Sequence, residues 1–247
     1  MAEEQKLTKN QKKELRKLEW QEKAKIEERK AKIKKYSIWG IGALIVIGAI
    51  AGLVWLVSAS PTPSQSEPIS VAPISSKDIT KGNLKSKVVL IEYADFQCSA
   101  CAVYHPFVNQ LLTDDGSKIL YVYRMFPLTS THPNSHISAQ AAYAAYKQGK
   151  FFEMSNLLFN NQADWADLQD PRSIFIGYAK SLKLNMDQFE KEMNSDEAKN
   201  YVNAMETEAL SEGMYSTPTF ILDGNKITNP NNYQDFKKLV DDEINKK

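Results

Sequence analysis

The stretch that decides the fold is LIEYADFQCSACAVYHPF, residues 90–107. It holds the only two cysteines of the 247-residue chain, Cys98 and Cys101, with two residues between them. The residues before the pair, 87–96, are rich in β-branched and aromatic side chains, which predicts a buried strand. The residues after the pair place apolar side chains at helical spacing, which predicts a helix that Pro106 should kink. The cysteines are therefore expected where a strand ends and a helix begins.

Two thiols at the start of a helix have a chemical consequence. The unpaired N–H groups and partial positive charge of a helix N-terminus stabilise an anion, so Cys98 is expected to form a thiolate near neutral pH. Cys101 lies on the same side of the first turn and is expected to be more buried. The pair predicts thiol–disulfide exchange, in which Cys98 reacts with the substrate and Cys101 resolves the mixed disulfide.

Three other interpretations of the pair compete with redox exchange. A structural disulfide stays open, although closing so short a loop removes little chain entropy. A zinc site would need four ligands, and only His105 stands nearby. Covalent haem attachment needs a histidine directly after the second cysteine, where the chain has Ala102. We therefore expect no metal and no cofactor at the cysteines.

The cysteine segment resembles a known family. YADFQCSACAVYHPFVNQLL is similar to the active-site segment of DsbA-like thioredoxin-fold oxidoreductases, in particular their membrane-anchored bacterial branch. Two further blocks resemble that family in the same order: RMFPLTSTHPNSHISAQAAYAAYKQGKFFEMSNLLFNNQ and the cis-proline strand GMYSTPTFILDGNKI. The resemblance covers the chain from about Lys81 to its C-terminus. It implies an α/β thioredoxin-like fold, a mixed sheet with helices on both faces, and a helical insertion at about 135–212.

The resemblance also implies roles for particular residues. Cys98 matches the nucleophile and Cys101 the buried partner. Thr217-Pro218 matches the dipeptide whose cis peptide bond faces the cysteines and leaves backbone for an extended substrate to pair with. Glu92 matches a buried acid that moves protons to and from the resolving thiol. From the residues alone, a glutamate inside an apolar strand is costly without a purpose, and a solvent-facing position at the sheet edge is the alternative.

The chain departs from the strongly oxidising relatives between its cysteines. Those relatives have Pro-His there, whereas this chain has Ser99-Ala100. Without that histidine the thiolate would rest on the helix terminus and backbone N–H groups, and a less extreme oxidant is inferred. Four side chains are predicted to border an apolar substrate groove around Cys98, with the protein core as the alternative for each: Phe96, Tyr104, Met214 and Tyr215.

The N-terminal quarter has a different character. Residues 1–35 carry 13 lysines and arginines against 7 acidic residues, although the formal net charge of the chain is only +1. The remainder is therefore mildly acidic, which argues against a nucleic-acid surface. The run IWGIGALIVIGAIAGLVWLV, residues 38–57, has no charge. As a helix it would rise about 1.5 Å per residue and span about 30 Å of bilayer hydrocarbon.

These features predict the order of domains. We expect a basic cytoplasmic segment at 1–35, a transmembrane helix at 36–58, a Ser/Pro-rich linker at 59–77 and a DsbA-like domain at 78–247. The lysines before the apolar run place the N-terminus in the cytoplasm and the domain outside it. A signal-anchor is favoured over a cleaved signal peptide, which is the alternative, because the charged segment and the apolar run are both long.

The predicted function is that of a membrane-tethered, extracytoplasmic thiol:disulfide oxidoreductase, which forms disulfides in reduced exported proteins. Its partners would be those substrates, the lipid bilayer through residues 38–57, and a membrane redox partner for reoxidation, which the resemblance implies to be quinone-linked. Two alternatives remain. One is a reductase or isomerase that uses the same site, and the other is a non-enzymatic tethered binding module or chaperone with a structural disulfide.

Overall fold

The computed structural model describes residues 67–247, together with residues 20, 25, 27–30, 48 and 52. The predicted transmembrane helix at 36–58 lies outside the described residues except for Gly48 and Gly52, and so does most of the basic segment. Within the described ranges, no helix combines the length and apolar character that a bilayer span requires.

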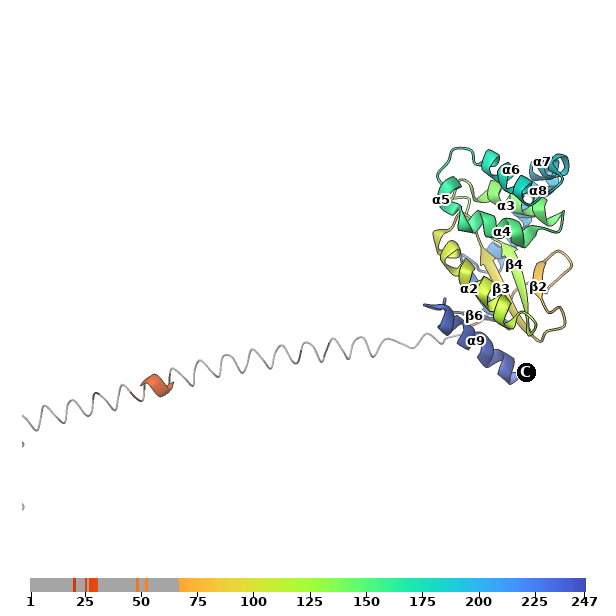
Figure 1. Ribbon diagram of the computed structural model, residues 1–247. Helices are drawn as coiled ribbons and strands as arrows, with labels where there is room; N and C mark the ends of the chain where they lie inside the picture. The colour runs from red at the N-terminus through yellow and green to blue at the C-terminus, as the bar shows by residue number, and fades with distance from the viewer. Residues whose placement is uncertain (1–19, 21–24, 26, 31–47, 49–51, 53–66) are drawn as a thin grey trace, which may run out of the picture. The chain divides into compact units, whose positions relative to one another are not determined.

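A mixed sheet forms the centre of the domain (Figure 1). Its strands are β1 (Glu67–Pro68), β2 (Ile79–Gly82), β3 (Val88–Ala94), β4 (Ile119–Met125), β5 (Thr219–Leu222) and β6 (Asn225–Ile227), in the spatial order β1-β6-β5-β3-β4-β2. β3 and β4 are parallel, and the other neighbours are antiparallel. The helix α2 (Ser99–Asp115) joins β3 to β4 as the crossover that a parallel pair needs.

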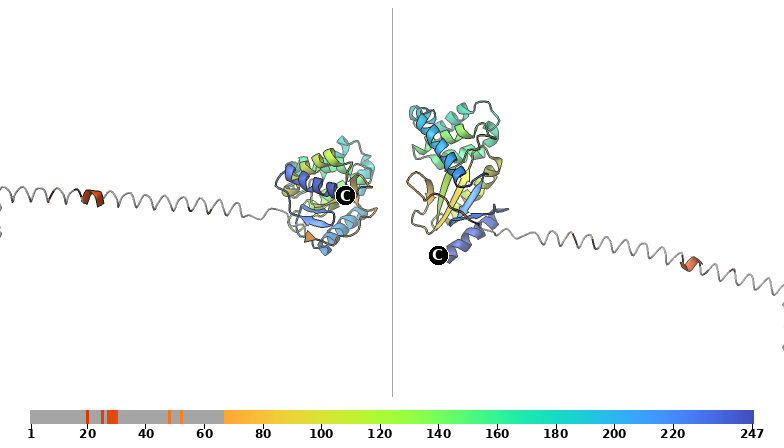
Figure 2. Two further views of the ribbon diagram at one scale, coloured as in Figure 1. Left: turned by 90° about the horizontal axis from the view of Figure 1, so that it is seen from below. Right: turned by 180° about the vertical axis from the view of Figure 1, so that it is seen from behind.

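A block of helices is inserted between β4 and β5. It comprises α3 (Ser135–Tyr146), α4 (Phe151–Asn160), α5 (Gln162–Trp165), α6 (Arg172–Ser181), α7 (Met186–Met193) and α8 (Asp196–Ser211). The helix α9 (Tyr233–Lys246) follows the last strand. Figures 1 and 2 show the inserted helices gathered at one end of the sheet and α9 at the other. The predicted α/β thioredoxin-like fold with a helical insertion is confirmed.

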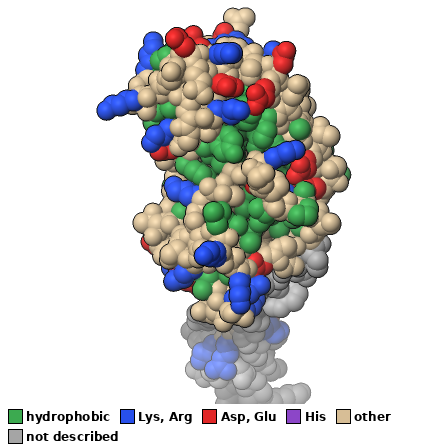
Figure 3. Space-filling view, turned by 90° about the vertical axis from the view of Figure 1, so that its right-hand side faces the viewer, with side chains coloured by type: hydrophobic (Ala, Val, Ile, Leu, Met, Phe, Trp, Pro, Cys, Tyr) green, Lys and Arg blue, Asp and Glu red, His purple; other side chains and the backbone are tan. Residues whose placement is uncertain are grey.

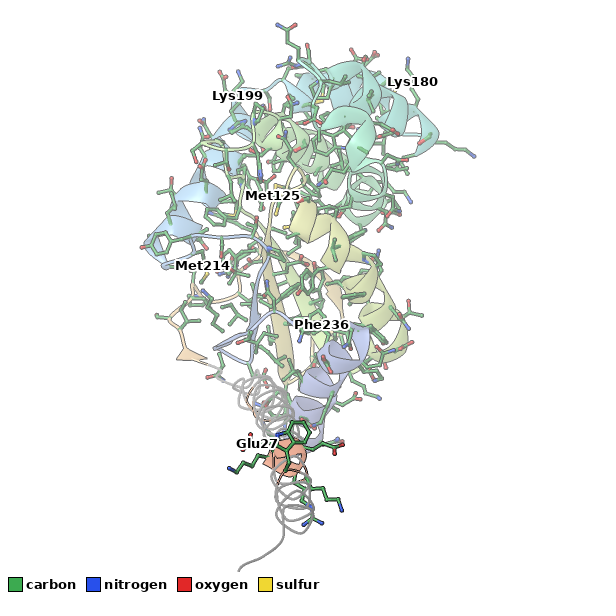
Figure 4. All side chains as sticks on the ribbon, turned by 90° about the vertical axis from the view of Figure 1, so that its left-hand side faces the viewer. Glu27, Met125, Lys180, Lys199, Met214 and Phe236 are labelled. Carbon is green, nitrogen blue, oxygen red and sulfur yellow. The ribbon has the colours of Figure 1, made fainter. Side chains whose placement is uncertain are left out.

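The alternation of side chains along β3 decides what faces the cysteine helix. Successive side chains of a strand point to opposite faces. Leu90 belongs to the core cluster that also contains buried residues of α2 and Phe236 of α9 (Figure 4), whereas Ile91 and Tyr93 belong to a second cluster on the other face. Glu92 has the parity of Leu90, so its side chain lies on the α2 side of the sheet.

The domain begins earlier than residue 78, where we expected it to start. β1 pairs with β6, and Ile69 and Val71 pack against the second cluster. The prediction that residues 67–77 form part of a free Ser/Pro-rich linker is therefore wrong. These residues cover apolar surface that the sheet would otherwise expose to water.

A buried arginine fixes this first segment to the sheet. Arg124 of β4 is 3% exposed, pairs with Asp78 at 2.9 Å and donates to the carbonyl oxygen of Ala72 at 2.8 Å. It also lies 3.5 Å from the carboxylate of Glu212, which accepts hydrogen bonds from the Ala72 N–H and the Tyr93 hydroxyl. Buried charge is tolerated here because it is paired and hydrogen-bonded.

Local turn chemistry marks several element ends. α7 ends at Met193, and α8 stops before Gly213, whose φ is 79°. The β5–β6 hairpin turns at Asp223-Gly224, where φ is 48° and 79°, as a two-residue hairpin turn requires. Pro106 lies inside α2, which continues to Asp115.

Candidate active site

The two cysteines occupy the junction between β3 and α2. Cys98 is the N-cap residue of α2, and Cys101 lies in its first turn. The connecting turn is held by Asp95, whose carbonyl oxygen accepts the Cys98 N–H at 3.1 Å and whose carboxylate accepts the Gln97 N–H at 2.8 Å. Cys98 is 8% exposed and Cys101 is 0% exposed, and both are free thiols. One sulfur is thus at the edge of the interior and the other is sealed within it.

The loop before β5 lies against Cys98. The Thr217-Pro218 peptide bond in this loop is cis. The Cys98 thiol donates to the carbonyl oxygen of Thr217 at 3.4 Å. The Thr217 hydroxyl is buried and has no hydrogen-bond partner among the described residues. The structure therefore brings together residues 98, 101, 217 and 218, four of the five residues that were predicted to form the site.

The surroundings of Cys98 favour its thiolate. Hydrogen bonding from the Cys101 thiol is the largest influence and lowers the pKa of Cys98 to about 5, against the opposing effect of burial. The N–H groups of Cys101 and Ala100 add to the lowering. We expected the thiolate to rest on the helix terminus and backbone N–H groups alone, so the contribution of the second thiol was missed.

Cys101 and Glu92 are both buried and influence each other electrostatically, and the pKa of each is raised. Burial raises the pKa of Cys101 well above its ordinary value, and the charges of Cys98 and Glu92 raise it further. Glu92 is 3% exposed, and burial raises its pKa to about 7 in spite of a hydrogen bond from the Tyr121 hydroxyl. The alternative of a solvent-facing Glu92 is therefore wrong.

Sequence reasoning did not single out the tyrosines beside Glu92. Tyr123 is the register partner of Glu92 on β4, and its hydroxyl is buried without a partner among the described residues. Tyr121 lies two residues earlier, on the same face. Their alternation is visible in the sequence, but their closeness to Glu92 follows only from the parallel register of two strands.

The four predicted groove residues separate into buried and accessible ones. Phe96 is 1% exposed and packs among core aromatic rings, and Met214 (labelled in Figure 4) is 0% exposed in the second cluster. The groove prediction is wrong for these two. Tyr104 is half-buried, and its hydroxyl donates to the carbonyl oxygen of Pro230 at 2.7 Å. Tyr215 is 78% exposed, so its groove role stays a prediction.

A pocket of about 490 Å³ lies beside β2 and is lined by none of these candidates. Its walls come from the first segment of the domain, β2 and the ends of α3 and α4. Figure 3 shows the face that lies on the right in Figure 1, where hydrophobic side chains gather in the middle. The pocket contains no cysteine and is not part of the thiol site.

Fold and thiol pair together define a class of protein. The class is that of the thiol:disulfide oxidoreductases. Such an enzyme needs a thiol of lowered pKa at the start of a helix, a buried second thiol and a buried carboxyl group, and this thioredoxin-like sheet carries all three. Comparison with known proteins agrees: a family model described as thioredoxin matches residues 75–242, and the chain belongs to this thioredoxin family.

Solved structures share the fold. Oxidised BdbD from Bacillus subtilis superposes with a TM-score of 0.63 at 18% identity, over 72% of this chain and 99% of that one. The alpha-DsbA1 protein of Wolbachia pipientis gives a TM-score of 0.61 at 23% identity, over 70% of this chain and 94% of that one. These likenesses confirm the predicted thioredoxin-like fold.

The curated relatives carry a different name. The chain is 32% identical over 199 residues to a protein called Na(+)/H(+) antiporter NhaA 1 of Mycobacterium sp. (strain KMS), which covers 77% of this chain and 31% of that relative. A protein of the same name from Salinispora arenicola is 35% identical over 152 residues, 61% of this chain and 22% of the relative. The chain thus spans less than a third of these relatives, and their named activity is not carried over.

Proposed function

We propose that the protein is a membrane-anchored, DsbA-like thiol:disulfide oxidoreductase that forms disulfides in exported proteins outside the cytoplasm. The observation that carries the proposal is the contrast between Cys98, whose pKa is about 5, and the sealed Cys101 beneath it. A stabilised thiolate favours the reduced form of the pair, so the disulfide form gives up its bond more readily to a substrate.

The exchange runs in two balanced steps. A substrate thiolate attacks Sγ of Cys98 in the oxidised pair, the bond to Cys101 breaks, and Cys101 leaves with the electron pair and takes a proton. Glu92 is the acid placed to supply it. A second substrate thiolate then attacks the substrate sulfur of the mixed disulfide, and Cys98 leaves as a thiolate. The substrate loses two electrons and two protons, while the cysteine pair gains two electrons and one proton and the solvent takes the other.

The location and partners rest on the sequence. The uncharged run 38–57 directly follows a lysine-rich segment, and no lysine or arginine stands between the run and Lys77. This asymmetry supports a single-pass anchor with the domain outside the cytoplasm. Continued turnover needs a membrane partner that takes the two electrons away, and the DsbA-like resemblance supports a quinone-linked one. Reduced exported proteins are the proposed substrates, and nucleic acid is not a proposed partner.

Disulfide transfer tests the activity directly. The oxidised full-length chain, purified in detergent, is mixed with a reduced unfolded protein, and the disulfides formed in that protein are counted. Cys98→Ser should abolish transfer, and the neighbouring Ser99→Ala should retain it. A Cys98→Ser variant that keeps the full activity of the wild type would refute the oxidoreductase and favour the binding-module alternative.

The reduction potential tests the direction. Equilibration with glutathione should give a potential well above the roughly −270 mV of thioredoxin, since the thiolate of Cys98 is stabilised. A value at or below that of thioredoxin would favour the reductase. The anchor is tested separately: the chain should stay with the membrane after alkaline washing, and protease added outside the cell should remove the domain.

A further inference from the structure

A side-chain amide from the helical insertion reaches the backbone of the cysteine turn. Gln162 is the first residue of α5. Its Nε2 donates to the carbonyl oxygen of Phe96 at 2.7 Å and to that of Cys98 at 3.0 Å. Both N–H groups of the Gln162 side-chain amide are therefore engaged, one with the carbonyl group before Gln97 and one with the carbonyl group after it. The contact spans 64 residues of sequence from Cys98 and joins the insertion to the reactive residue itself.

The same segment is attached to the turn at a second place. The Gln97 side chain donates to the carbonyl oxygen of Ala166 at 2.7 Å and accepts the Asn134 N–H at 2.6 Å. The Asn134 side chain in turn donates to the carbonyl oxygen of Leu168 at 2.7 Å. Residues 162–168 therefore hold residues 96–98 from both sides of Gln97, through side-chain amides on backbone groups. A movement of the insertion relative to the turn before Cys98 would break these hydrogen bonds.

We propose that Gln162 is a positioning residue that sets how readily Cys98 holds its thiolate, and that the helical insertion acts on the redox pair through this contact. The inference deepens the proposed function and rests on it. The Gln162 N–H groups offset the partial negative charge of two carbonyl oxygens, one of Cys98 itself and one of the residue two positions before it. The Cys98 carbonyl also accepts the first helical bond, from the Ala102 N–H at 3.2 Å.

Two substitutions separate charge from hydrogen bonding. Gln162→Glu keeps the shape but replaces the donor by a negatively charged acceptor that faces two carbonyl groups. It should raise the pKa of Cys98 by about one unit, a tenfold change in proton affinity, for a unit charge near the sulfur. Gln162→Met removes the donors without adding charge and should raise that pKa by about half a unit.

The measurement is a pH titration of thiolate ultraviolet absorbance in the reduced full-length chain. The signal is assignable because the chain has only two cysteines, and Cys101 stays protonated over the range in which Cys98 titrates. The rate of alkylation of Cys98 at mildly acidic pH should fall in parallel, up to about tenfold for Gln162→Glu.

Gln148 provides a matched control. Its Nε2 also donates to a backbone carbonyl, that of Asn185 at 3.1 Å, but it follows α3 and does not contact the cysteine turn. Gln148→Glu makes the same chemical change in the same insertion and should leave the pKa of Cys98 unchanged. A shift as large as that of Gln162→Glu would show a general charge effect and overturn the proposal.

Only variants that fold are compared with the wild type. Circular dichroism identifies a variant that fails to fold, and Gln162→Met then decides the question, since it adds no buried charge. A pKa of Cys98 equal to that of the wild type in every folded Gln162 variant overturns the proposal. Thiolate titration needs no disulfide transfer, so a wild type without transfer activity would refute the proposed function and leave this result standing on its own.

Discussion

Replacing Glu92 with glutamine should make the oxidised domain more stable at alkaline pH. The carboxyl group is 3% exposed, and burial raises its pKa from 4.5 to about 7. The pKa of Glu92 is therefore about 2.5 units higher in the folded chain than in the unfolded chain, so ionising this carboxyl group costs more free energy in the folded chain. At 1.36 kcal/mol per unit this amounts to about 3 kcal/mol. The amide oxygen of glutamine can still accept the hydrogen bond from the Tyr121 hydroxyl, so the local structure should be retained.

The sign of the effect follows from the direction of the shift. The folded pKa of Glu92 lies above its unfolded value, so the contribution of this group to stability is full below about pH 4.5 and is lost as the pH rises through about 7. Between pH 5 and pH 8, ionisation of Glu92 should lower the free energy of unfolding of the wild type by up to about 3 kcal/mol. Glu92→Gln has no carboxyl group at this position and should not show this decrease. At pH 5 the two proteins should differ little.

Urea unfolding of the oxidised full-length chain at both pH values measures this difference. The oxidised form is used because the Cys98 thiol then has no proton to lose. Asp95 is also buried with a raised pKa, but it is present in both proteins and cancels in the comparison. An equal loss of stability between pH 5 and pH 8 in wild type and Glu92→Gln would refute the assignment of Glu92 as a buried, strained acid.

Three further outcomes are expected. In the reduced chain the folded pKa of Cys98 lies below its usual 9, at about 5, so stability should fall as the pH drops through this window, by at most about 1.4 kcal/mol per pH unit in urea unfolding. Arg124→Met should lower the free energy of unfolding by about 3–5 kcal/mol because it leaves buried carboxylates without their positive partner. The control Lys150→Met, which removes an exposed ion pair, should lower it by less than about 1 kcal/mol. Phe96→Ala should lower the free energy of unfolding by about 3–5 kcal/mol because the side chain is buried in the core. Tyr215→Ala should change the free energy of unfolding by no more than about 0.5 kcal/mol, because the side chain is exposed, and should raise the KM for a protein substrate.

The position of the thiols could be predicted from sequence because it depends on short-range order. A strand, a turn and a helix in direct succession place Cys98 at a helix start in any packing of the rest. Phe96 lies two residues beyond the end of β3 and joins the cluster that contains Leu90, so its core position depends on the turn and not on strand alternation. Met214 is different, because the face that it joins is decided by how α8 docks on the sheet.

The contacts that support the site could not be predicted in the same way. Arg124 is paired with Asp78 and lies beside Glu212, residues drawn from segments far apart in the chain. Gln162 reaches Cys98 across 64 residues. Composition and periodicity describe each of these segments alone, and neither predicts which polar side chains will meet. The Ser/Pro composition of residues 59–77 likewise indicated a tether, although its last part has apolar side chains that the sheet buries.

The proposed direction of electron flow depends on Cys98 and on the groups beneath it. Glu92 has a pKa near neutrality, whereas the pKa of Cys101 lies well above its ordinary value. A proton therefore passes from Glu92 to the Cys101 thiolate with a gain in free energy, and the reverse transfer costs free energy. The proton step thus favours oxidation of a substrate, in which Cys101 gains a proton. The two directions differ also in the stability of the Cys98 thiolate, which is present only in the reduced pair. Because that thiolate is stabilised by the Cys101 thiol and by the N–H groups of Cys101 and Ala100, reduction of the pair is favoured and substrate oxidation follows. A variant that raised the pKa of Cys98 while leaving Glu92 intact would shift this balance toward a reductase without slowing the proton step.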